Sequence, residues 1–179
     1  MKAIVFLGGG RITAALLAGL HLARDSRPVL VYDRHPDKLR RLKRLYGIAI
    51  KLDLQRAVAQ ARLMIIAVRP SSAADLLREI GNLNRPVAAV SLAAGIPLSK
   101  LRERVGRPVR WGRAMPSPLC RSRRGLTALA FDRNFPTAAR NELTNLFAKV
   151  GSTLEIREDK LDIFTVSYSP SRTTIATRR

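Results

Sequence analysis

The chain opens with a short apolar run that ends in three glycines, Gly8–Gly10, and a helix-like segment from Ile12 to Leu20 follows directly. This order predicts a strand, a tight turn and a helix. In that arrangement Gly8 permits the turn, Gly10 lets the backbone approach a pyrophosphate, and the helix directs free N–H groups at the anion. Thr13 occupies the third position of the fingerprint, where glycine or alanine is usual. The opening segment therefore predicts a dinucleotide-binding loop rather than a flexible turn.

A carboxylate follows the second apolar strand, which is predicted over residues 28–32. Asp33 lies 23 positions after Gly10, near the spacing of roughly 20 expected for a side chain that accepts hydrogen bonds from the ribose hydroxyls. The next residue, Arg34, leaves two cofactors open. A carboxylate favours the free ribose of NAD, whereas a guanidinium could hold the extra phosphate of NADP. The sequence predicts NAD or NADP, with a slight preference for NAD.

Strand-like and helix-like segments alternate along the rest of the chain, and this alternation predicts an α/β fold. We expect a doubly wound, Rossmann-type and mainly parallel sheet of about eight strands with helices on both faces. The continuous apolar run 63–68 is typical of a central parallel strand, and Pro70 ends it. The loops after Leu7, Val68 and Val90 should then converge on one crevice. Residues 1–158 are predicted to form the NAD(P)-binding domain. Residues 159–179 are predicted to be the truncated start of a helical domain or a disordered basic tail.

The chain of 179 residues carries a formal net charge of +20, from 33 Lys and Arg against 13 Asp and Glu. Three segments, 38–44, 102–113 and 121–124, are candidate surfaces for polyanions. Aromatic residues make up only 5% of the chain, however, and no nucleic-acid-binding module is visible. The charge is therefore interpreted as a solvated basic surface that also attracts anionic cofactors, and a nucleic-acid partner is not expected.

The cysteine, the histidines and the length of the opening apolar run exclude further classes of protein and of site. The single cysteine, Cys120, excludes an internal disulfide framework and favours a reducing compartment. The opening apolar run is too short for a secretory or membrane-spanning segment, so a cytoplasmic protein without a membrane partner is expected. The two histidines, His21 and His35, lack the spacing of metal ligands, and no metal site is predicted.

Five motifs resemble, in order and spacing, the cofactor-binding domain of pyrroline-5-carboxylate reductases. They are Gly8–Ile12, Ala67–Pro70, Ser91–Ile96, Arg113–Pro116 and Gly125–Leu129. The resemblance implies NAD(P)H-dependent hydride transfer to the C=N bond of a cyclic imine, the last step of proline synthesis. Deazaflavin-dependent and β-hydroxyacid reductases share such a nucleotide domain, and the segment Met115-Pro116 favours the imine reductases over them.

The resemblance also assigns cofactor-binding residues and implies a missing part. Its pyrophosphate loop would be Gly8, Gly9, Gly10, Arg11 and Ile12, and Asp33 and Arg34 would lie at the adenosine ribose. Beside the cofactor would run Ala67, Val68, Arg69 and Pro70. Near the nicotinamide would lie Ala94 and Gly95. No catalytic residue is assigned. The family continues with a helical dimerisation domain that completes the imine site, and this sequence lacks a match to it. We therefore expect an oxidoreductase that acts on a small imine or imino acid, and this chain could be active or inactive without the helical domain. The alternative is a non-catalytic NAD(P)-binding module. Homo-oligomerisation is doubtful without the helical domain.

Overall fold

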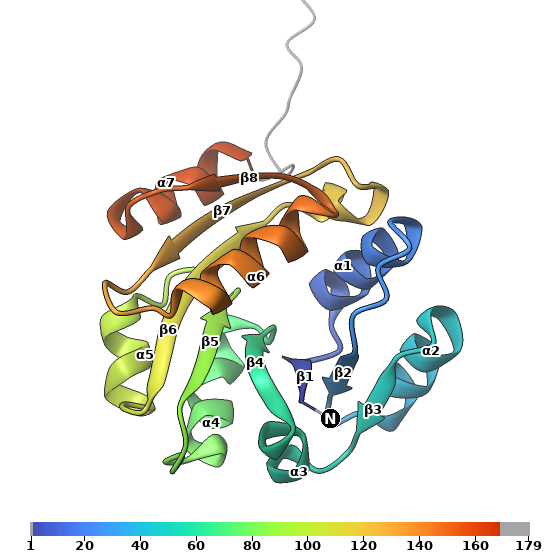
Figure 1. Cartoon of the computed structure of the whole chain (residues 1–179), viewed down its shortest axis with the longest axis horizontal. Coiled ribbons are helices and arrows are strands. Elements are labelled where there is room, and N and C mark those ends of the chain that lie inside the picture. Colours follow the sequence, from blue (N-terminus) through green and yellow to red (C-terminus); the bar gives the residue numbers. More distant parts are fainter. Residues whose placement is uncertain (1, 169–179) are drawn as a thin grey trace, which may run out of the picture.

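Eight strands form one sheet in the computed structural model, which describes residues 2–168 and their side chains as far as residue 164 (Figure 1). The strands are β1 (Ala3–Leu7), β2 (Val29–Tyr32), β3 (Ala49–Lys51), β4 (Ala61–Ile66), β5 (Val87–Ser91), β6 (Val109–Pro116), β7 (Gly125–Phe131) and β8 (Gly151–Glu155). Their order across the sheet is β3-β2-β1-β4-β5-β6-β7-β8. Neighbouring strands are parallel except for the antiparallel pair β6 and β7. The predicted mainly parallel sheet of about eight strands is confirmed.

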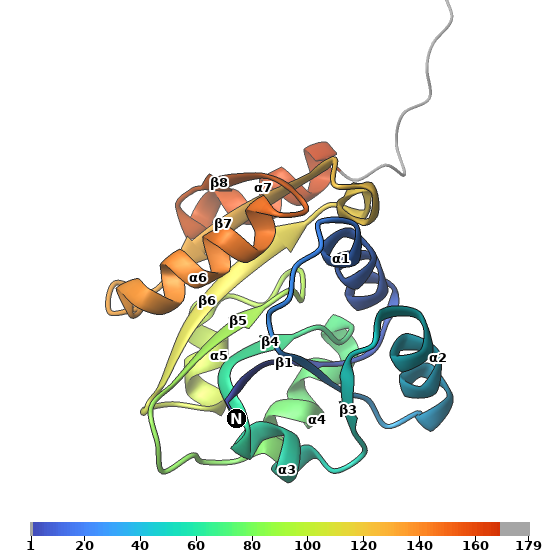
Figure 2. The ribbon, with the colours of Figure 1, turned by 45° about the vertical axis from the view of Figure 1, so that its right-hand side comes forward.

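Helices cover both faces of this sheet (Figures 1 and 2). They are α1 (Arg11–Leu22), α2 (Pro36–Tyr46), α3 (Leu54–Ala59), α4 (Pro70–Ile80), α5 (Leu98–Arg104), the 3-10 helix η1 (Pro118–Ser122), α6 (Thr137–Ala148) and α7 (Glu158–Tyr168). Apolar residues of α1, α2 and α6 share one core with the sheet, and those of α3, α4 and α5 share the other. The fold is therefore doubly wound, as the sequence predicts. Within residues 2–168, no helix has the length and apolar character needed to cross a membrane.

Strand β1 shows why the opening run is apolar throughout. Ile4 and Phe6 belong to the core beneath α1, whereas Val5 and Leu7 belong to the core on the opposite face. All four side chains are fully buried. Because alternate side chains of a strand point to opposite faces, a strand covered on both sides needs apolar residues at every position.

Helix α2 combines a buried apolar stripe with a basic outer surface. Leu39 and Leu42 are buried in the core, and Pro36 occupies the first turn, where its missing N–H has no helical partner in any case. Gly47 ends the helix in the left-handed conformation with φ of 65°, and its N–H donates to the carbonyl oxygen of Lys43 at 2.9 Å. The helix therefore delivers the chain to the edge strand β3.

Some predicted boundaries shift in the structure. The central strand β4 spans Ala61–Ile66 rather than 63–68, and α4 begins at Pro70, the residue predicted to end the strand. Proline fits the first helical position because its φ is preset. Strand β6 extends to Pro116 because its second half pairs with β7, the next strand along the chain.

The end of the chain bears on the predicted domain boundary. Helix α7 covers Glu158–Tyr168 and contacts β6 and β7. The rest of the predicted tail, residues 169–179, lies outside the described residues. The division at residue 158 therefore stays a prediction.

The thiol of Cys120 is expected to be inert in the folded protein. Its side chain is fully buried, and burial raises its pKa to about 11. Because the thiolate is the reactive form, labelling by iodoacetamide at neutral pH should be negligible in buffer and should go to completion in denaturant. Mass spectrometry of the alkylated protein checks this, and rapid labelling of the native protein would contradict the packing of η1 against α1.

Candidate functional site

Four neighbouring strands end at the same edge of the sheet and carry the predicted cofactor residues. The loops after β2, β1, β4 and β5 hold, in that order, Asp33, the three glycines, Ala67 and Ala94. In open α/β sheets, ligands bind outside the carboxyl ends of the strands, where the chain leaves for opposite faces. The topology therefore gathers these loops at the position expected for a nucleotide.

Gly8 makes the turn that links β1 to α1. Its φ is +118°, a conformation that L side chains rarely adopt, and a Cβ at this position would lie 2.7 Å from the carbonyl oxygen of Ala67. Its N–H donates to the carbonyl oxygen of Tyr32 at 2.8 Å. The turn thus depends on glycine for its backbone conformation and for its close approach to the loop after β4.

Gly10 is the N-cap of α1 and leaves open space at the start of the helix. No side chain caps α1, and a Cβ on Gly10 would have only the carbonyl oxygen of Ala67 within 4 Å, at 3.9 Å. The first N–H groups of a helix lack internal partners and carry the positive end of its dipole. Exposed Arg11 and half-buried Ile12 form the first turn. This helix end is suited to an anion.

Thr13 supports the loop instead of weakening it. Its side chain is fully buried, and its hydroxyl donates to the carbonyl oxygen of Gly8 at 2.6 Å. The sequence alone marks Thr13 as a departure from the fingerprint. The structure shows that its hydroxyl holds the carbonyl of the strained glycine in place.

The carboxylate of Asp33 is directed at the glycine loop. Its Oδ2 accepts from the backbone N–H of Gly9 at 2.7 Å, and its Oδ1 accepts from the backbone N–H of His35 at 2.9 Å. The residue is only 8% exposed. Burial alone would raise the pKa of Asp33, but these two N–H groups, the His35 ring and the ammonium of Lys38 lower it below 3.8 overall. Asp33 therefore joins β2 to the glycine loop, and its predicted contact with a ribose stays a prediction.

Two cations and an imidazole lie around the end of β2. The ring Nδ1 of His35 lies 3.0 Å from Oδ1 of Asp33, and Nζ of Lys38 lies 3.7 Å from Oδ2. Arg34 is exposed and forms an ion pair with Glu79 at the end of α4. The cations Arg34 and Lys38 and the ring of His35 thus lie close to one largely buried carboxylate.

The segment after β4 contacts the glycine loop, and the segment after β5 lies further along the sheet. The Ala67 N–H donates to the carbonyl oxygen of Leu7 at 2.9 Å. Beyond the half-buried Val68, Arg69 and Pro70 are exposed at the start of α4.

In the loop after β5, Ala94 is half-buried, and Gly95 has φ of +71° with open space where a Cβ would stand. Among residues 2–168, no hydrogen bond links Ala94 or Gly95 to the glycine loop. Hydrogen bonds and close contacts therefore join the loops after β1, β2 and β4. The loop after β5 borders the same edge of the sheet without a hydrogen bond to the glycine loop among the described residues.

Arg113 of β6 has an unusual environment that the sequence did not reveal. It pairs with Ser91 in the sheet, is 1% exposed, and points its guanidinium toward α7, where Nη2 lies 2.7 Å from Asp162 and Nη1 lies 3.4 Å from Glu158. Within the described residues, its Nε has no hydrogen-bond partner. The only hint in the sequence was that Arg113 lies two positions from Trp111 and from Met115 and so shares a strand face with apolar residues. No cluster of three His, Cys, Asp or Glu side chains in the described part of the chain could hold a metal ion.

Asp33→Asn is expected to reduce stability at neutral pH by about 1–3 kcal/mol, because two N–H donors lose their charged acceptor. The lowered pKa means that the wild-type carboxylate stabilises the fold above pH 3.8 and that this contribution disappears as the pH falls through the folded-state pKa. The two proteins should therefore converge in stability in acid. Thermal unfolding from neutral pH to well below pH 3.8 measures this. A constant difference across that range would contradict the proposed role of the charge.

Comparison with known proteins places this site in a family. The family model described as "NADP oxidoreductase coenzyme F420-dependent" matches residues 3–95, which is just over half of the chain and includes every strand that borders the glycine loop. The chain belongs to this family. Within it, the chain is a pyrroline-5-carboxylate reductase-like, NAD(P)-binding domain.

Curated relatives agree with this assignment. Pyrroline-5-carboxylate reductase of Mycobacterium tuberculosis (strain H37Rv) is 30% identical over 175 residues, which cover 92% of this chain and 58% of that protein. The Escherichia coli (strain K12) enzyme is 29% identical over 160 residues, which cover 88% of this chain and 60% of that protein. The chain thus spans about 60% of the length of the curated relatives that it matches.

Solved structures support the fold. The pyrroline-5-carboxylate reductase of Coxiella burnetii superposes with a TM-score of 0.85 at 24% identity, covering 95% of this chain and 64% of that one. The Plasmodium falciparum pyrroline carboxylate reductase, whose structure contains NADP, gives a TM-score of 0.79 at 21% identity, covering 92% and 61%. At these identities the likeness concerns the fold alone.

Proposed function

We propose that this domain binds NADP(H) at the carboxyl edge of β1, β2, β4 and β5 and serves the reduction of a small cyclic imine. One observation carries the proposal: the Gly8–Gly10 turn is held from two sides, by Asp33 and by the loop after β4, while the start of α1 stays open. A pyrophosphate needs a rigid backbone cradle and a free helix N-terminus, and this arrangement provides both.

The residues present fit a phosphorylated dinucleotide. Gly10 leaves space for the pyrophosphate, and Arg11 adds a positive charge beside it. Arg34, His35 and Lys38 would meet the adenosine ribose and its extra phosphate. The sequence-based preference for NAD finds no support in the comparisons, because the family description and the Plasmodium structure both name NADP. We therefore expect the phosphorylated cofactor to bind more tightly.

The remaining predicted residues would position the cofactor for reduction. Ala67–Pro70 would run beside it, and the open space at Gly95 would let the nicotinamide approach the loop after β5. When bound, the reduced nicotinamide supplies a hydride to the carbon of a protonated C=N bond, so that the imine becomes an amine and the cofactor leaves oxidised. Because the imine arrives already protonated, the residues of this chain need only orient the two reactants.

Cofactor titration followed by a turnover assay tests this function. Purified protein is titrated with NADPH and with NADH by fluorescence, and pyrroline-5-carboxylate is then added while loss of the reduced cofactor is followed. NADPH binding with turnover is the expected result for a reductase. Absence of binding by either cofactor would overturn the proposal.

A non-catalytic NAD(P)-binding module is the second candidate. It is favoured by one specific observation, that the chain spans about 60% of the length of the two curated relatives compared above. Tight NADPH binding without any turnover of the imine would support the module and refute the reductase. Turnover by the 179-residue chain alone would do the reverse.

Arg34→Gln should separate the two cofactors. We expect NADPH affinity to fall about 10-fold, because a charge-assisted hydrogen bond to phosphate is removed, while NADH affinity changes little. Arg104→Gln on α5 is a matched control, since it removes the same charge from an exposed position on a helix that packs against β6, four strands away from β2. Equal losses for NADPH and NADH would show that Arg34 does not recognise the extra phosphate.

A further inference from the structure

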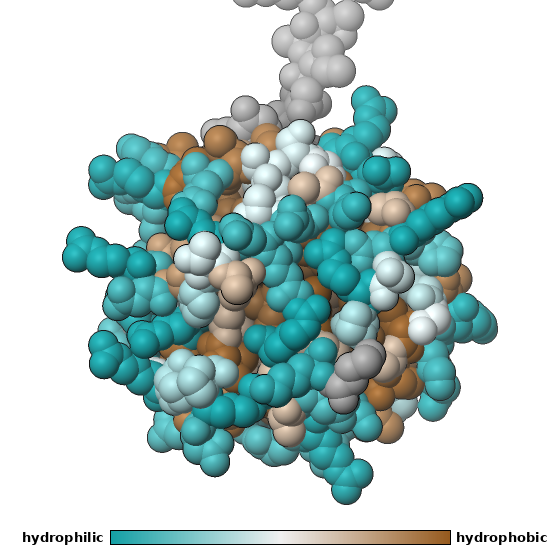
Figure 3. Space-filling view, viewed as in Figure 1, coloured by the Kyte–Doolittle hydropathy of each residue, from teal (hydrophilic) through white to brown (hydrophobic). Residues whose placement is uncertain are grey.

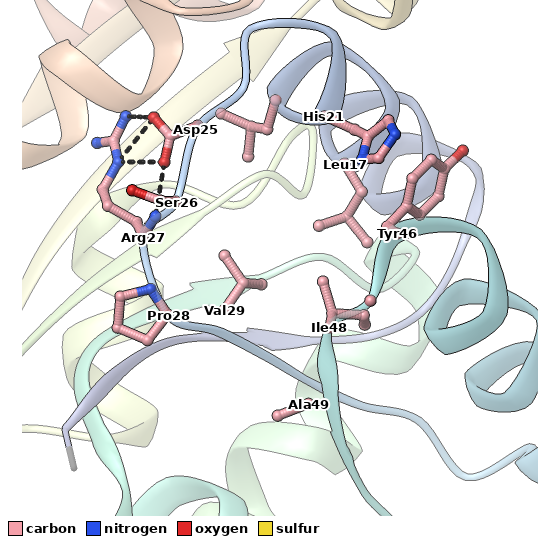
Figure 4. A pocket seen from close by; sticks show the side chains of 12 residues that line it. Leu17, His21, Asp25, Ser26, Arg27, Pro28, Val29, Tyr46, Ile48 and Ala49 are labelled. Atoms are coloured by element: carbon pink, nitrogen blue, oxygen red, sulfur yellow. Dashed lines mark hydrogen bonds and ion pairs between the residues drawn. The ribbon is translucent and has the colours of Figure 1, made fainter.

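A hollow of about 380 Å³ lies between α1, the end of α2 and the start of β2 (Figure 4). Leu17, Val29 and Ile48 form its apolar floor, and their side chains point into the same space. Val29 begins β2, whereas the glycine loop meets the opposite end of that strand at Tyr32 and Asp33. The hollow is therefore separate from the proposed cofactor site, and its size is within the range of roughly 300–1,000 Å³ for small-ligand sites.

Two aromatic rings stand side by side on one wall of this hollow. His21 of α1 and Tyr46 of α2 have ring centroids 6.0 Å apart, with planes tilted by 60° (Figure 4). His21 is exposed and Tyr46 is half-buried, so both rings are accessible from the hollow. Accessible rings beside an apolar floor provide stacking surfaces for a planar heterocycle.

Helix α2, whose last residue Tyr46 lines the hollow, is strongly basic. This helix carries five cations, Lys38, Arg40, Arg41, Lys43 and Arg44, and a single acid, Asp37. Arg40, Arg41 and Arg44 line a second hollow on its outer surface together with Asp37, which pairs with Arg40. Among the described residues, no carboxylate lies within ion-pairing distance of Arg41, Lys43 or Arg44. These three positive charges are uncompensated.

The opposite rim carries paired cations and one exposed arginine. Nε of Arg27 lies 2.9 and 3.0 Å from the two carboxylate oxygens of Asp25, and Arg24 beside them is exposed. The hydrogen bonds and the charge of Arg27, with a smaller contribution from Lys149, lower the pKa of Asp25 overall. Burial and the charge of Arg27 lower the pKa of Arg62, whose guanidinium pairs with Glu142. Hydrophilic side chains cover most of the face shown in Figure 3, with small hydrophobic areas between them.

These features favour one class of partner. A membrane surface would need an apolar helix face to insert, but Leu39 and Leu42 of α2 are buried in the core, and Leu45 is the one leucine of this helix that is exposed, which does not make a face. A dinucleotide at the carboxyl edge of the sheet would not use cations on the outer surface of α2. A chain of phosphates with planar bases would use the cations and the rings together.

We propose that the hollow between α1 and α2 and the outer surface of α2 bind single-stranded nucleic acid, with a base against Tyr46 and His21 and phosphates on Arg41, Lys43 and Arg44. This departs from the expectation drawn from the sequence, which had no sign that the two rings meet beside these cations. The binding would be independent of base sequence, since stacking and phosphate contacts do not distinguish bases.

Fluorescence anisotropy with a labelled single-stranded RNA of about 10 nucleotides tests the proposal. Affinity should fall steeply with salt, and Arg41→Glu with Arg44→Glu should weaken binding at least about 10-fold and reduce the salt slope by about 0.7 for each phosphate that the variant no longer neutralises. The control is Arg104→Glu with Arg107→Glu, which changes the net charge equally at exposed positions on or next to α5. Equal weakening by both pairs would show that only the overall charge matters and would overturn the site.

Ring variants test the stacking separately. Tyr46→Ala and His21→Ala should each weaken RNA binding about 10-fold, while Tyr46→Phe keeps the ring and should bind as the wild type does. His21 is exposed, so its variant remains informative if Tyr46→Ala fails to fold. No RNA binding at low salt would overturn the proposal. The proposal would also be overturned if anionic lipid vesicles or a poly-glutamate peptide bound with the same affinity as RNA and if the ring variants left that affinity unchanged.

Discussion

Replacing Gly8 with alanine is expected to destabilise the domain by at least about 3 kcal/mol and to abolish NADPH binding. Two physical reasons combine. A residue with a Cβ is strained at φ of +118°, and the Cβ would lie 2.7 Å from the carbonyl oxygen of Ala67. Relief of this contact would separate the glycine loop from the loop after β4. Chemical denaturation and NADPH titration of the variant measure the two effects.

Gly10→Ala is the matched control for this effect. Gly10 has φ of −77°, which any residue adopts, and the nearest atom to a Cβ would be 3.9 Å away. Stability should therefore change by less than about 1 kcal/mol. NADPH affinity should nevertheless fall more than about 10-fold, because the added methyl group occupies the space in which the backbone approaches the pyrophosphate. Wild-type affinity in Gly10→Ala would show that the loop does not hold a pyrophosphate.

Replacing Arg113 with alanine is expected to cost about 2–4 kcal/mol and to loosen α7. The side chain is 1% exposed, so its removal leaves a cavity between β6 and α7. Its partners Glu158 and Asp162 remain partly solvated, at 34% and 58% exposure, so the loss of their ion pairs adds little. Thermal unfolding gives the stability, and hydrogen exchange over α7 reports whether the helix detaches.

Arg113→Met distinguishes packing from charge. Methionine fills much of the same volume and removes the Nε that now lacks a partner. We expect its stability to lie within about 1 kcal/mol of the wild type, with faster exchange limited to α7. A methionine variant as unstable as the alanine variant would show that the ion pairs to α7 dominate.

Local patterns predicted most of the fold. The three glycines, the apolar run before them and the position of Asp33 are features of neighbouring residues, and they identified the strand, turn and helix around the glycine loop correctly. The unbroken apolar run of β4 and the stripe of α2 likewise report burial through their periodicity. Boundaries were less accurate: β4 ends at Ile66 rather than at residue 68, because apolar character alone does not mark where the pairing with β1 and β5 ends.

The candidate site was only partly predictable. The sequence placed Asp33 at the end of β2, but it could not show that both carboxylate oxygens accept N–H groups, one of them from the glycine loop 24 positions away. Thr13 departs from the usual motif, although its hydroxyl binds the carbonyl of Gly8. Both outcomes depend on side-chain direction, which spacing along the chain does not determine.

The sequence by itself determined the doubly wound class, the glycine loop and the excess of positive charge, because these follow from residue type, periodicity and the conformational freedom of glycine. Only the tertiary structure decided that Arg113 is buried against α7 and that Tyr46 meets His21 above an apolar hollow. These features arise from contacts between segments far apart in the sequence. Such contacts form only when the helices pack on the sheet, and no local pattern encodes them.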